Sequence, residues 1–260
     1  MVPWDMTFSY YDEASKSYKE LKTTTNSKEY SDLWIPFLRS FAAHQKKKGW
    51  FDRTVIAMDE RALDAMQDAY RIAQEAAPGI KMSLAGNYHK ELVDKIYDYC
   101  IAWKQQFTPE DLALRNSKGW ISTSYTACPD AMPNVGSNNE PIEATYLPLY
   151  CIANGFNGFL RWAWMNWTDN PMYDSRFKLF TPGDTYIVYP GNHSSRRFEH
   201  IIRGVQNVAK IETLRKEYKQ KKNQKDLQQL EDALSQFKNP TPNEAELRES
   251  IYKIELLLNK

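Results

Sequence analysis

The sequence predicts an α/β protein built as a (β/α)8 barrel of the TIM type, incomplete in this chain and followed by C-terminal helices. Two observations lead to this fold class. Short apolar runs alternate with helix-forming segments until about residue 200, and such alternation is typical of parallel strands joined by right-handed crossovers. Polar and aromatic residues gather where the apolar runs end, which is where a barrel builds its active site.

The barrel part is predicted to hold six strands with helices between them. The helix expected over residues 29–47 ends at Lys46-Lys47-Lys48-Gly49, where positive charge and a glycine favour termination. The helix expected over residues 62–77 is rich in strong helix formers and ends at Pro78-Gly79. The predicted strands are residues 6–11, 54–58, 81–85, 99–103, 119–126 and 159–164, with a short helix or turn at 91–97 and a helix at 143–154.

After Arg196 the pattern becomes wholly helical, with a break at Pro240 and Pro242. Two narrow apolar stripes predict a helical hairpin that packs against itself or on the barrel. We therefore predict a partial barrel catalytic domain over residues 1–200 and a helical segment over residues 201–260. The expected helices are 198–222, 224–237 and 243–257, and the stripes are Leu227, Leu230, Leu234 and Phe237, and Leu247, Ile251, Ile254 and Leu258.

Charge and composition narrow the classes of partner. The 34 basic residues nearly cancel the 33 acidic ones, so no global field favours nucleic acid or an anionic membrane. The polar stretch 219–225 is interpreted as a solvated helix turn. We expect no membrane span and no signal peptide in this chain. Its three cysteines and four histidines show no disulfide or metal-ligand spacing, so we expect no cofactor and no catalytic metal.

Two neighbouring acids, Asp59 and Glu60, follow the apolar run that ends at Met58. If the run is a strand, alternation puts Asp59 on the same face as Val55 and Ala57, and both acids reach the rim of the barrel. The other interpretation is that they only open the next helix, because acids are favoured at a helix N-terminus.

Three motifs resemble glycoside hydrolase family 123. They are the aromatic run 156–167 with its continuation 170–177, the segment 182–191 that contains Gly-Asp-Thr and Tyr-Pro-Gly, and Met58-Asp59-Glu60 at the end of its strand. The resemblance covers roughly residues 1 to 210.

The resemblance implies a retaining exo-β-N-acetylgalactosaminidase with a (β/α)8 barrel in which an Asp and a Glu follow the fourth strand. In this chain the pair follows only the second predicted strand. We therefore expect the first two βα units, and the β-sandwich domain that such enzymes carry upstream, to be missing here. Residues 6–11 would then be the third strand and residues 159–164 the eighth. Relatives of this kind are commonly exported by bacteria, which suggests a secreted or periplasmic protein.

The implied chemistry is substrate-assisted. The 2-acetamido oxygen of the sugar attacks the anomeric carbon in place of an enzyme carboxylate. Glu60 is then the general acid and later the base, and Asp59 accepts the amide N–H and stabilises the oxazolinium.

The remaining site candidates lie at or after the other strand ends. Tyr125 is the first choice and Tyr88 the second to donate a hydrogen bond to the acetamido carbonyl, although either could be a core residue. Alternation sends Trp162 and Trp164 to the face opposite Arg161, and Arg161 could pair with Asp174 instead of binding sugar. The further candidates are Trp162, Trp164 and Trp167 as a floor for the sugar ring, and Asn87, Asn134, Arg161, Asp174 and Asp184 as hydroxyl binders.

The leading hypothesis is a glycosidase that acts on glycans with a terminal β-N-acetylhexosamine. A non-catalytic carbohydrate-binding protein derived from such an enzyme is the alternative, because an incomplete barrel would expose strand edges and apolar surface. A helical interaction module built on residues 200–260 is a third hypothesis, but it explains none of the strand-end residues. The sequence leaves open the choice between galacto and gluco configuration and the oligomeric state.

Overall fold

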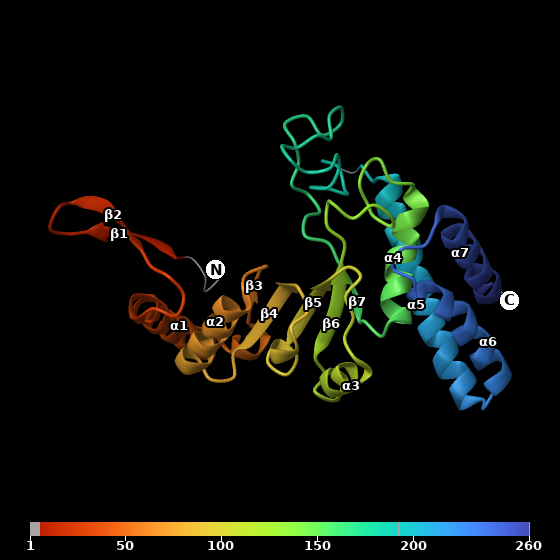
Figure 1. The fold of residues 1–260 in the computed structure, drawn as a ribbon, viewed down its shortest axis with the longest axis horizontal. Coiled ribbons are helices and arrows are strands. Elements are labelled where there is room, and N and C mark those ends of the chain that lie inside the picture. Colours follow the sequence, from red (N-terminus) through yellow and green to blue (C-terminus); the bar gives the residue numbers. More distant parts are fainter. Residues whose placement is uncertain (1–5, 192, 260) are drawn as a thin grey trace. The chain divides into compact units, whose positions relative to one another are not determined.

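The chain folds into two compact units, shown as one ribbon in Figure 1. The computed structural model describes residues 6–191 and 193–259. Unit 1 runs to Ile101 and includes Phe107–Ile121, whereas unit 2 comprises Ala102–Gln106 and the chain from Ser122 onward. No helix in these described ranges is long and apolar enough to cross a membrane.

The core of unit 1 contains three parallel strands: β3 (Val55–Met58), β4 (Lys81–Gly86) and β5 (Asp98–Ala102). Ile56 and Met58 on β3 are buried, whereas Val55 and Ala57 are exposed. The alternation expected of a strand is therefore present, and it ends at Met58, since Asp59 and Glu60 are both exposed.

The two helices predicted over residues 29–47 and 62–77 are both present in unit 1, and they pack on each other. Helix α1 (Lys28–Lys48) has its side-chain cap at Ser27 and ends at Gly49, whose φ of 69° is left-handed. Helix α2 (Leu63–Ala76) contacts α1 and buries its apolar face. A 3-10 turn, η1 (Phe51–Arg53), leads from α1 into β3.

The prediction for residues 6–11 is wrong in its pairing. They form β1 (Thr7–Asp12), which pairs antiparallel with β2 (Ser17–Lys22) in a two-stranded hairpin that was not predicted. The turn is closed by Asp12, which accepts a hydrogen bond from Ser15 N–H at 3.1 Å and pairs with Lys19 at 2.6 Å. A connection this short permits only antiparallel pairing, because parallel neighbours need a crossover of about a dozen residues or more.

A helix missing from the prediction, α3 (Pro109–Ser117), also belongs to unit 1. Its N-terminus is a capping box in which Thr108 and Asp111 bond each other's backbone N–H groups. Arg115 of this helix is fully buried and donates to the carbonyls of Val93 and Ile96, at 2.9 and 2.7 Å. The predicted helix or turn over 91–97 is a single 3-10 turn, η2 (Lys90–Leu92).

Unit 2 pairs two parallel strands, β6 (Ile121–Tyr125) and β7 (Gly158–Leu160), through the helix α4 (Pro141–Ala153). Helix α5 (Arg196–Gln220) crosses α4 so closely that a Cβ at Gly204 would lie 2.7 Å from the Thr145 carbonyl oxygen. Glycine is therefore required at this crossing.

The C-terminal helices pack on one another and on α4. Helix α6 (Gln224–Ser235), the 3-10 turn η3 (Gln236–Lys238) and helix α7 (Glu244–Leu258) contact one another and α4 within unit 2. Phe237 is fully buried, and its ring centroid lies 5.0 Å from that of Tyr146 on α4.

The α/β class is confirmed, and the described residues hold five parallel strands, three in unit 1 and two in unit 2. The other predicted strand, residues 6–11, is the hairpin strand β1. The numbering of strands three to eight of a barrel needs six parallel strands, so it does not fit the five that are described. The arrangement matches part of a (β/α)8 barrel. The boundary predicted at residue 200 stays a prediction.

Candidate active site

The acid pair Asp59 and Glu60 lies directly after β3, in the loop that leads to α2. The N-cap of α2 is Ala62, without a side-chain cap, and the acid in the first turn of the helix is Asp64. Asp59 and Glu60 therefore precede the N-cap of α2 and lie outside the helix.

Glu60 lies over the carboxyl end of the neighbouring strand β4. A Cβ built on Gly86, the last residue of β4, would lie 3.5 Å from Glu60 Cγ and 3.6 Å from its Cα. Both acids are exposed. A ligand at this edge of unit 1 can therefore reach the two carboxylates without a rearrangement of the core.

Arg61 fixes the orientation of Asp59. Its Nε donates to Asp59 Oδ1 at 3.1 Å and its Nη2 to Oδ2 at 3.2 Å, a bidentate contact. The two side chains keep 48% and 63% of their exposure, so the pair contributes orientation more than stability. Arg61 was not among the predicted site residues, although its position two residues after Asp59 was the available signal.

Replacing Arg61 with Gln is expected to lower kcat by about tenfold, because the role predicted for Asp59 requires a carboxylate that is held in one orientation. The free energy of unfolding should change by at most about 1 kcal/mol, since the ion pair is exposed. Steady-state kinetics and thermal melts measure the two effects. Arg61→Lys keeps the charge but loses the planar fork, so it should recover only part of the rate.

The matched control is Arg39→Gln, an exposed arginine on α1. A kcat for Arg61→Gln equal to that of this control would show that the bidentate contact does not orient Asp59 for catalysis.

A hydrogen-bonded loop follows β4, where Asn87 and Tyr88 were predicted to bind substrate. Tyr99 of β5 fixes the loop, because its hydroxyl donates to Asn87 O at 2.6 Å and accepts from His89 N–H at 2.8 Å. Asn87 is exposed and Tyr88 is half-buried. The residues that follow β4 are thus rigidly placed beside the loop that carries the acid pair.

Tyr88 donates its hydroxyl proton to Asp111 Oδ2, at 2.7 Å. Burial, together with the hydrogen bond and the charge of Asp111, raises the pKa of Tyr88 to about 12. Burial also raises the pKa of Asp111, but hydrogen bonds from Lys90, Tyr88 and Thr108 outweigh it and the net pKa is lowered. Since a phenol has one proton, this Tyr88 presents an acceptor oxygen, whereas the prediction required a donor.

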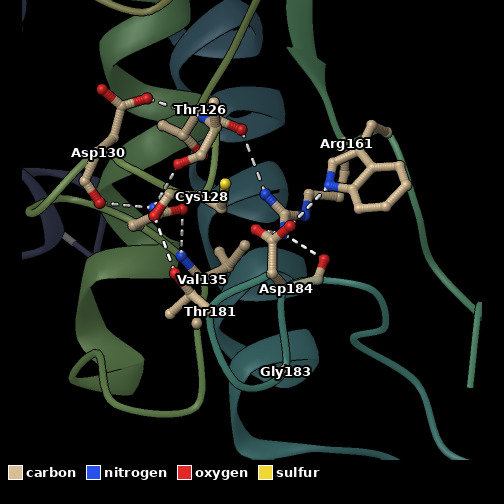
Figure 2. A network of polar contacts seen from close by, with 12 residues as sticks. Thr126, Cys128, Asp130, Val135, Arg161, Thr181, Gly183 and Asp184 are labelled. Carbon is tan, nitrogen blue, oxygen red and sulfur yellow. Dashed lines mark hydrogen bonds and ion pairs between the residues drawn. The ribbon is translucent and has the colours of Figure 1, made fainter. Parts of the chain in front are cut away.

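The candidates of unit 2 centre on a buried ion pair between Arg161 and Asp184, drawn in Figure 2. The guanidinium donates to both the carboxylate and the carbonyl of Asp184 and to the Thr126 carbonyl at 3.2 Å. Trp162 Nε1 donates to the other carboxylate oxygen of Asp184 at 3.0 Å. Arg161 therefore pairs with Asp184, and the alternative ion pair with Asp174 is not formed.

Asp174 instead pairs with Arg176 at the surface, through two side-chain hydrogen bonds of 2.9 and 2.7 Å. The hydrogen bonds from Arg176 lower the pKa of Asp174 to about 2. Asn134 is buried in a turn, where its side chain donates to the carbonyls of Ala127 and Asp130. Asn134 thus has its side-chain amide bonded inside unit 2, and Arg161 has both terminal nitrogens bonded there, whereas its buried Nε has no hydrogen-bond partner among the described residues.

The predicted alternation of the tryptophans does not apply, because β7 ends at Leu160, before the first of them. Trp162 is 46% exposed, beside the ring of Phe180. Trp164 packs edge-on against Phe198 of α5 and lines an apolar hollow of about 250 Å³ between α4, β7 and α5.

The last two candidates differ in exposure. Trp167 donates its indole N–H to Val188 O at 2.9 Å and is 39% exposed. Tyr125 ends β6 at 8% exposure, and its carbonyl accepts a hydrogen bond from Trp103 N–H. The substrate roles of all the unit 2 candidates stay predictions.

Comparison with known proteins identifies the family. The model of the glycoside hydrolase 123 catalytic domain matches residues 1–214. A solved structure of a family 123 glycoside hydrolase from Clostridium perfringens, reported for the details of glycolipid glycan hydrolysis, has the same fold with a TM-score of 0.83 at 24% identity. That match covers 98% of this chain and 48% of the other, so this chain spans about half the length of that protein. A search of curated proteins finds no match. The match over residues 1–214 shows that the chain belongs to glycoside hydrolase family 123.

Proposed function

We propose that this chain is a glycosidase that removes terminal β-N-acetylhexosamine, specifically N-acetylgalactosamine, with retention of configuration. The observation that carries the proposal is the exposed pair of acids after β3, with Glu60 over the end of β4 and Asp59 oriented by Arg61. Family membership supports glycoside hydrolysis as the reaction class. The Clostridium perfringens protein further suggests a glycan carried on a lipid as a substrate.

The first step breaks the glycosidic bond without an enzyme nucleophile. Glu60 gives its proton to the departing oxygen while the carbonyl oxygen of the 2-acetamido group attacks the anomeric carbon. An oxazolinium forms on the sugar, and Glu60 becomes a carboxylate. The substrate amide takes the place of the second carboxylate that ordinary retaining glycosidases use.

Asp59 serves the amide in both steps. Its carboxylate accepts the acetamido N–H, which orients the carbonyl oxygen for attack and stabilises the positive charge of the oxazolinium. Arg61 occupies one direction on each carboxylate oxygen, and each oxygen keeps a further lone pair for the substrate. The pair is thus oriented and still open to a ligand.

The second step releases the sugar. Glu60, now ionised, removes a proton from water as the water attacks the anomeric carbon from the face that the leaving group left. The oxazolinium opens, and the acetamido group and the β configuration are restored. One residue therefore acts as acid and then as base, which explains why a single glutamate beside Asp59 suffices.

Tyr125 is proposed to donate to the acetamido carbonyl, and Tyr88 to accept from a sugar hydroxyl. The remaining candidates of unit 2 would shape the sugar subsite, with the exposed Trp162 and Trp167 as ring-stacking surfaces. The catalytic part is proposed to extend over residues 1–200, with residues 201–260 as a helical segment that packs on it.

The exposure of those two tryptophans also favours a second candidate function, non-catalytic carbohydrate binding. Chromophore release from an aryl β-N-acetylgalactosaminide separates the two, with the aryl glucosaminide and the galactoside that lacks the acetamido group as comparisons. Turnover of the galactosaminide alone supports the proposal. Turnover of the plain galactoside would contradict the substrate-assisted mechanism, and binding of all three without turnover would favour the second function.

Asp59→Asn tests the contact with the amide without relying on turnover. The probe is a thiazoline analogue of N-acetylgalactosamine, which mimics the oxazolinium. The variant should bind it about 10–100-fold more weakly, because a charge-assisted hydrogen bond is replaced by a neutral one. Calorimetric titration measures the loss. Asp32→Asn, an exposed aspartate on α1, is the control, and equal affinities for the two variants would remove Asp59 from this role.

A further inference from the structure

Unit 1 carries a polar hollow at the opposite end of β4 from the acid pair. It has a volume of about 560 Å³ and lies beside the amino-terminal ends of β4 and β5. Its size is typical of a small-molecule site. Lys81, which begins β4, lines it, whereas Gly86 at the other end of the strand lies under Glu60. Five residues of strand separate the two places by about 17 Å.

Three lysines line this hollow. Lys81 Nζ lies 4.6 Å from the ring centroid of Tyr97 and donates to Asp52 O at 2.9 Å. Lys118 Nζ lies 4.2 Å from the ring centroid of Trp120. The aromatic faces hold these two ammonium groups in place through cation–π contacts.

The third lysine, Lys95, is half-buried in the lining. Within the described residues, none of the three ammonium groups forms an ion pair with a carboxylate. The one acid of the lining is Asp94, whose backbone carbonyl accepts a hydrogen bond from Lys118 at 3.3 Å. The hollow thus concentrates positive charge in a protein whose total charge is close to zero.

We propose that this hollow is an accessory binding site for an acidic saccharide, a sugar ring that carries a sulfate or carboxylate group. The lysines supply the charge for the anion, and the Asp94 carboxylate and the Tyr70 hydroxyl supply partners for sugar hydroxyls. A concave site of this size fits a small anionic ring, whereas nucleic acid requires an extended basic stripe. The choice of a saccharide rests on the proposed function of the chain, and the choice of an anion rests on the lysines alone.

Titration of the whole chain with galactose 6-sulfate, galactose and inorganic sulfate tests the site. Galactose carries no acetamido group, so the proposed active site at Asp59 and Glu60 should bind these probes only weakly. The sulfated sugar should bind at least about tenfold more tightly than either galactose or sulfate, because only it uses both kinds of contact. The binding should weaken as salt is raised.

Lys95→Gln should lower the affinity for galactose 6-sulfate by about tenfold, and Lys95→Arg should retain it. The fold is expected to survive, because Lys95 lies in the lining of the hollow and glutamine keeps part of its apolar stem. Lys216→Gln, an exposed lysine on α5, is the control. Unchanged binding in Lys95→Gln, or equal affinity for the sugar with and without sulfate, would overturn the proposal.

If inorganic sulfate binds as tightly as the sulfated sugar, the proposal of a saccharide ligand is overturned, and the hollow is a site for an anion only. Glu60→Gln should bind galactose 6-sulfate as the original chain does, since Glu60 lies at the other end of β4. A chain that binds the sulfated sugar but not the thiazoline would contradict the proposed function alone. The two failures are therefore distinguishable.

Discussion

Glu60→Gln is expected to lower kcat for the proposed substrate, a β-N-acetylgalactosaminide with a poor leaving group, by about 10²–10⁴-fold, the usual contribution of a positioned acid–base group. Glutamine has the same shape but no proton to give, so the departing oxygen must leave as an anion. The fold should be unaffected, because Glu60 is exposed and glutamine keeps the shape of its side chain over the end of β4. For a substrate whose leaving group is stable as an anion, the rate of the first step should fall less, because that leaving group needs no proton.

Added azide separates the second step from the first. Azide attacks the anomeric carbon without a general base, so it should restore part of the turnover of an activated substrate by Glu60→Gln and yield a β-glycosyl azide. Chromophore release and the configuration of the product are the measurements. Glu20→Gln, an exposed glutamate on β2, is the matched control. A Glu60 variant as active as this control on a poor leaving group would assign the proton transfer to another residue.

The parallel strands of unit 1 could be predicted from sequence because each combines a local apolar run with a turn or helix on either side. The hairpin could not be distinguished in this way. A strand such as β1 has the same local pattern whether its neighbour is parallel or antiparallel, and the deciding feature is the tight turn that Asp12 closes. Helix α3 had a usable signal, Thr108-Pro109 with Asp111 three residues after the cap, which is a helix-start pattern.

The candidate site was predictable only where its residues are neighbours in the sequence. Asp59 and Glu60 are adjacent at the end of one strand, so their joint position follows from β3 alone. The partner of Tyr88 is Asp111, 23 residues away, and the partner of Arg161 is Asp184, also 23 residues away. No periodicity links such pairs, and the charge balance allowed Asp174 equally well. Where a side chain has several equivalent partners in the sequence, tertiary packing determines which of them it contacts.

Asp184→Asn is expected to destabilise unit 2 by about 3 kcal/mol, because removing one partner of a buried ion pair leaves the other charge uncompensated. Arg161 and Asp184 keep 0% and 2% of their side-chain exposure, so solvent cannot replace the lost carboxylate. An asparagine at this place also has only one acceptor oxygen. If that oxygen faces the guanidinium, the amide NH₂ opposes the indole N–H of Trp162, which now donates to the second carboxylate oxygen.

Thermal melts should show a lower unfolding midpoint by roughly 6–12 °C for this loss in a chain of this size. The matched control is Asp174→Asn, which removes a carboxylate from the exposed pair with Arg176 and should leave the midpoint unchanged. Replacing both members, Arg161→Met with Asp184→Leu, should cost less than Asp184→Asn alone, because no unpaired charge stays buried. A double variant less stable than the single one would show that the pair itself, and not the isolated guanidinium, carries the stability of this part of the fold.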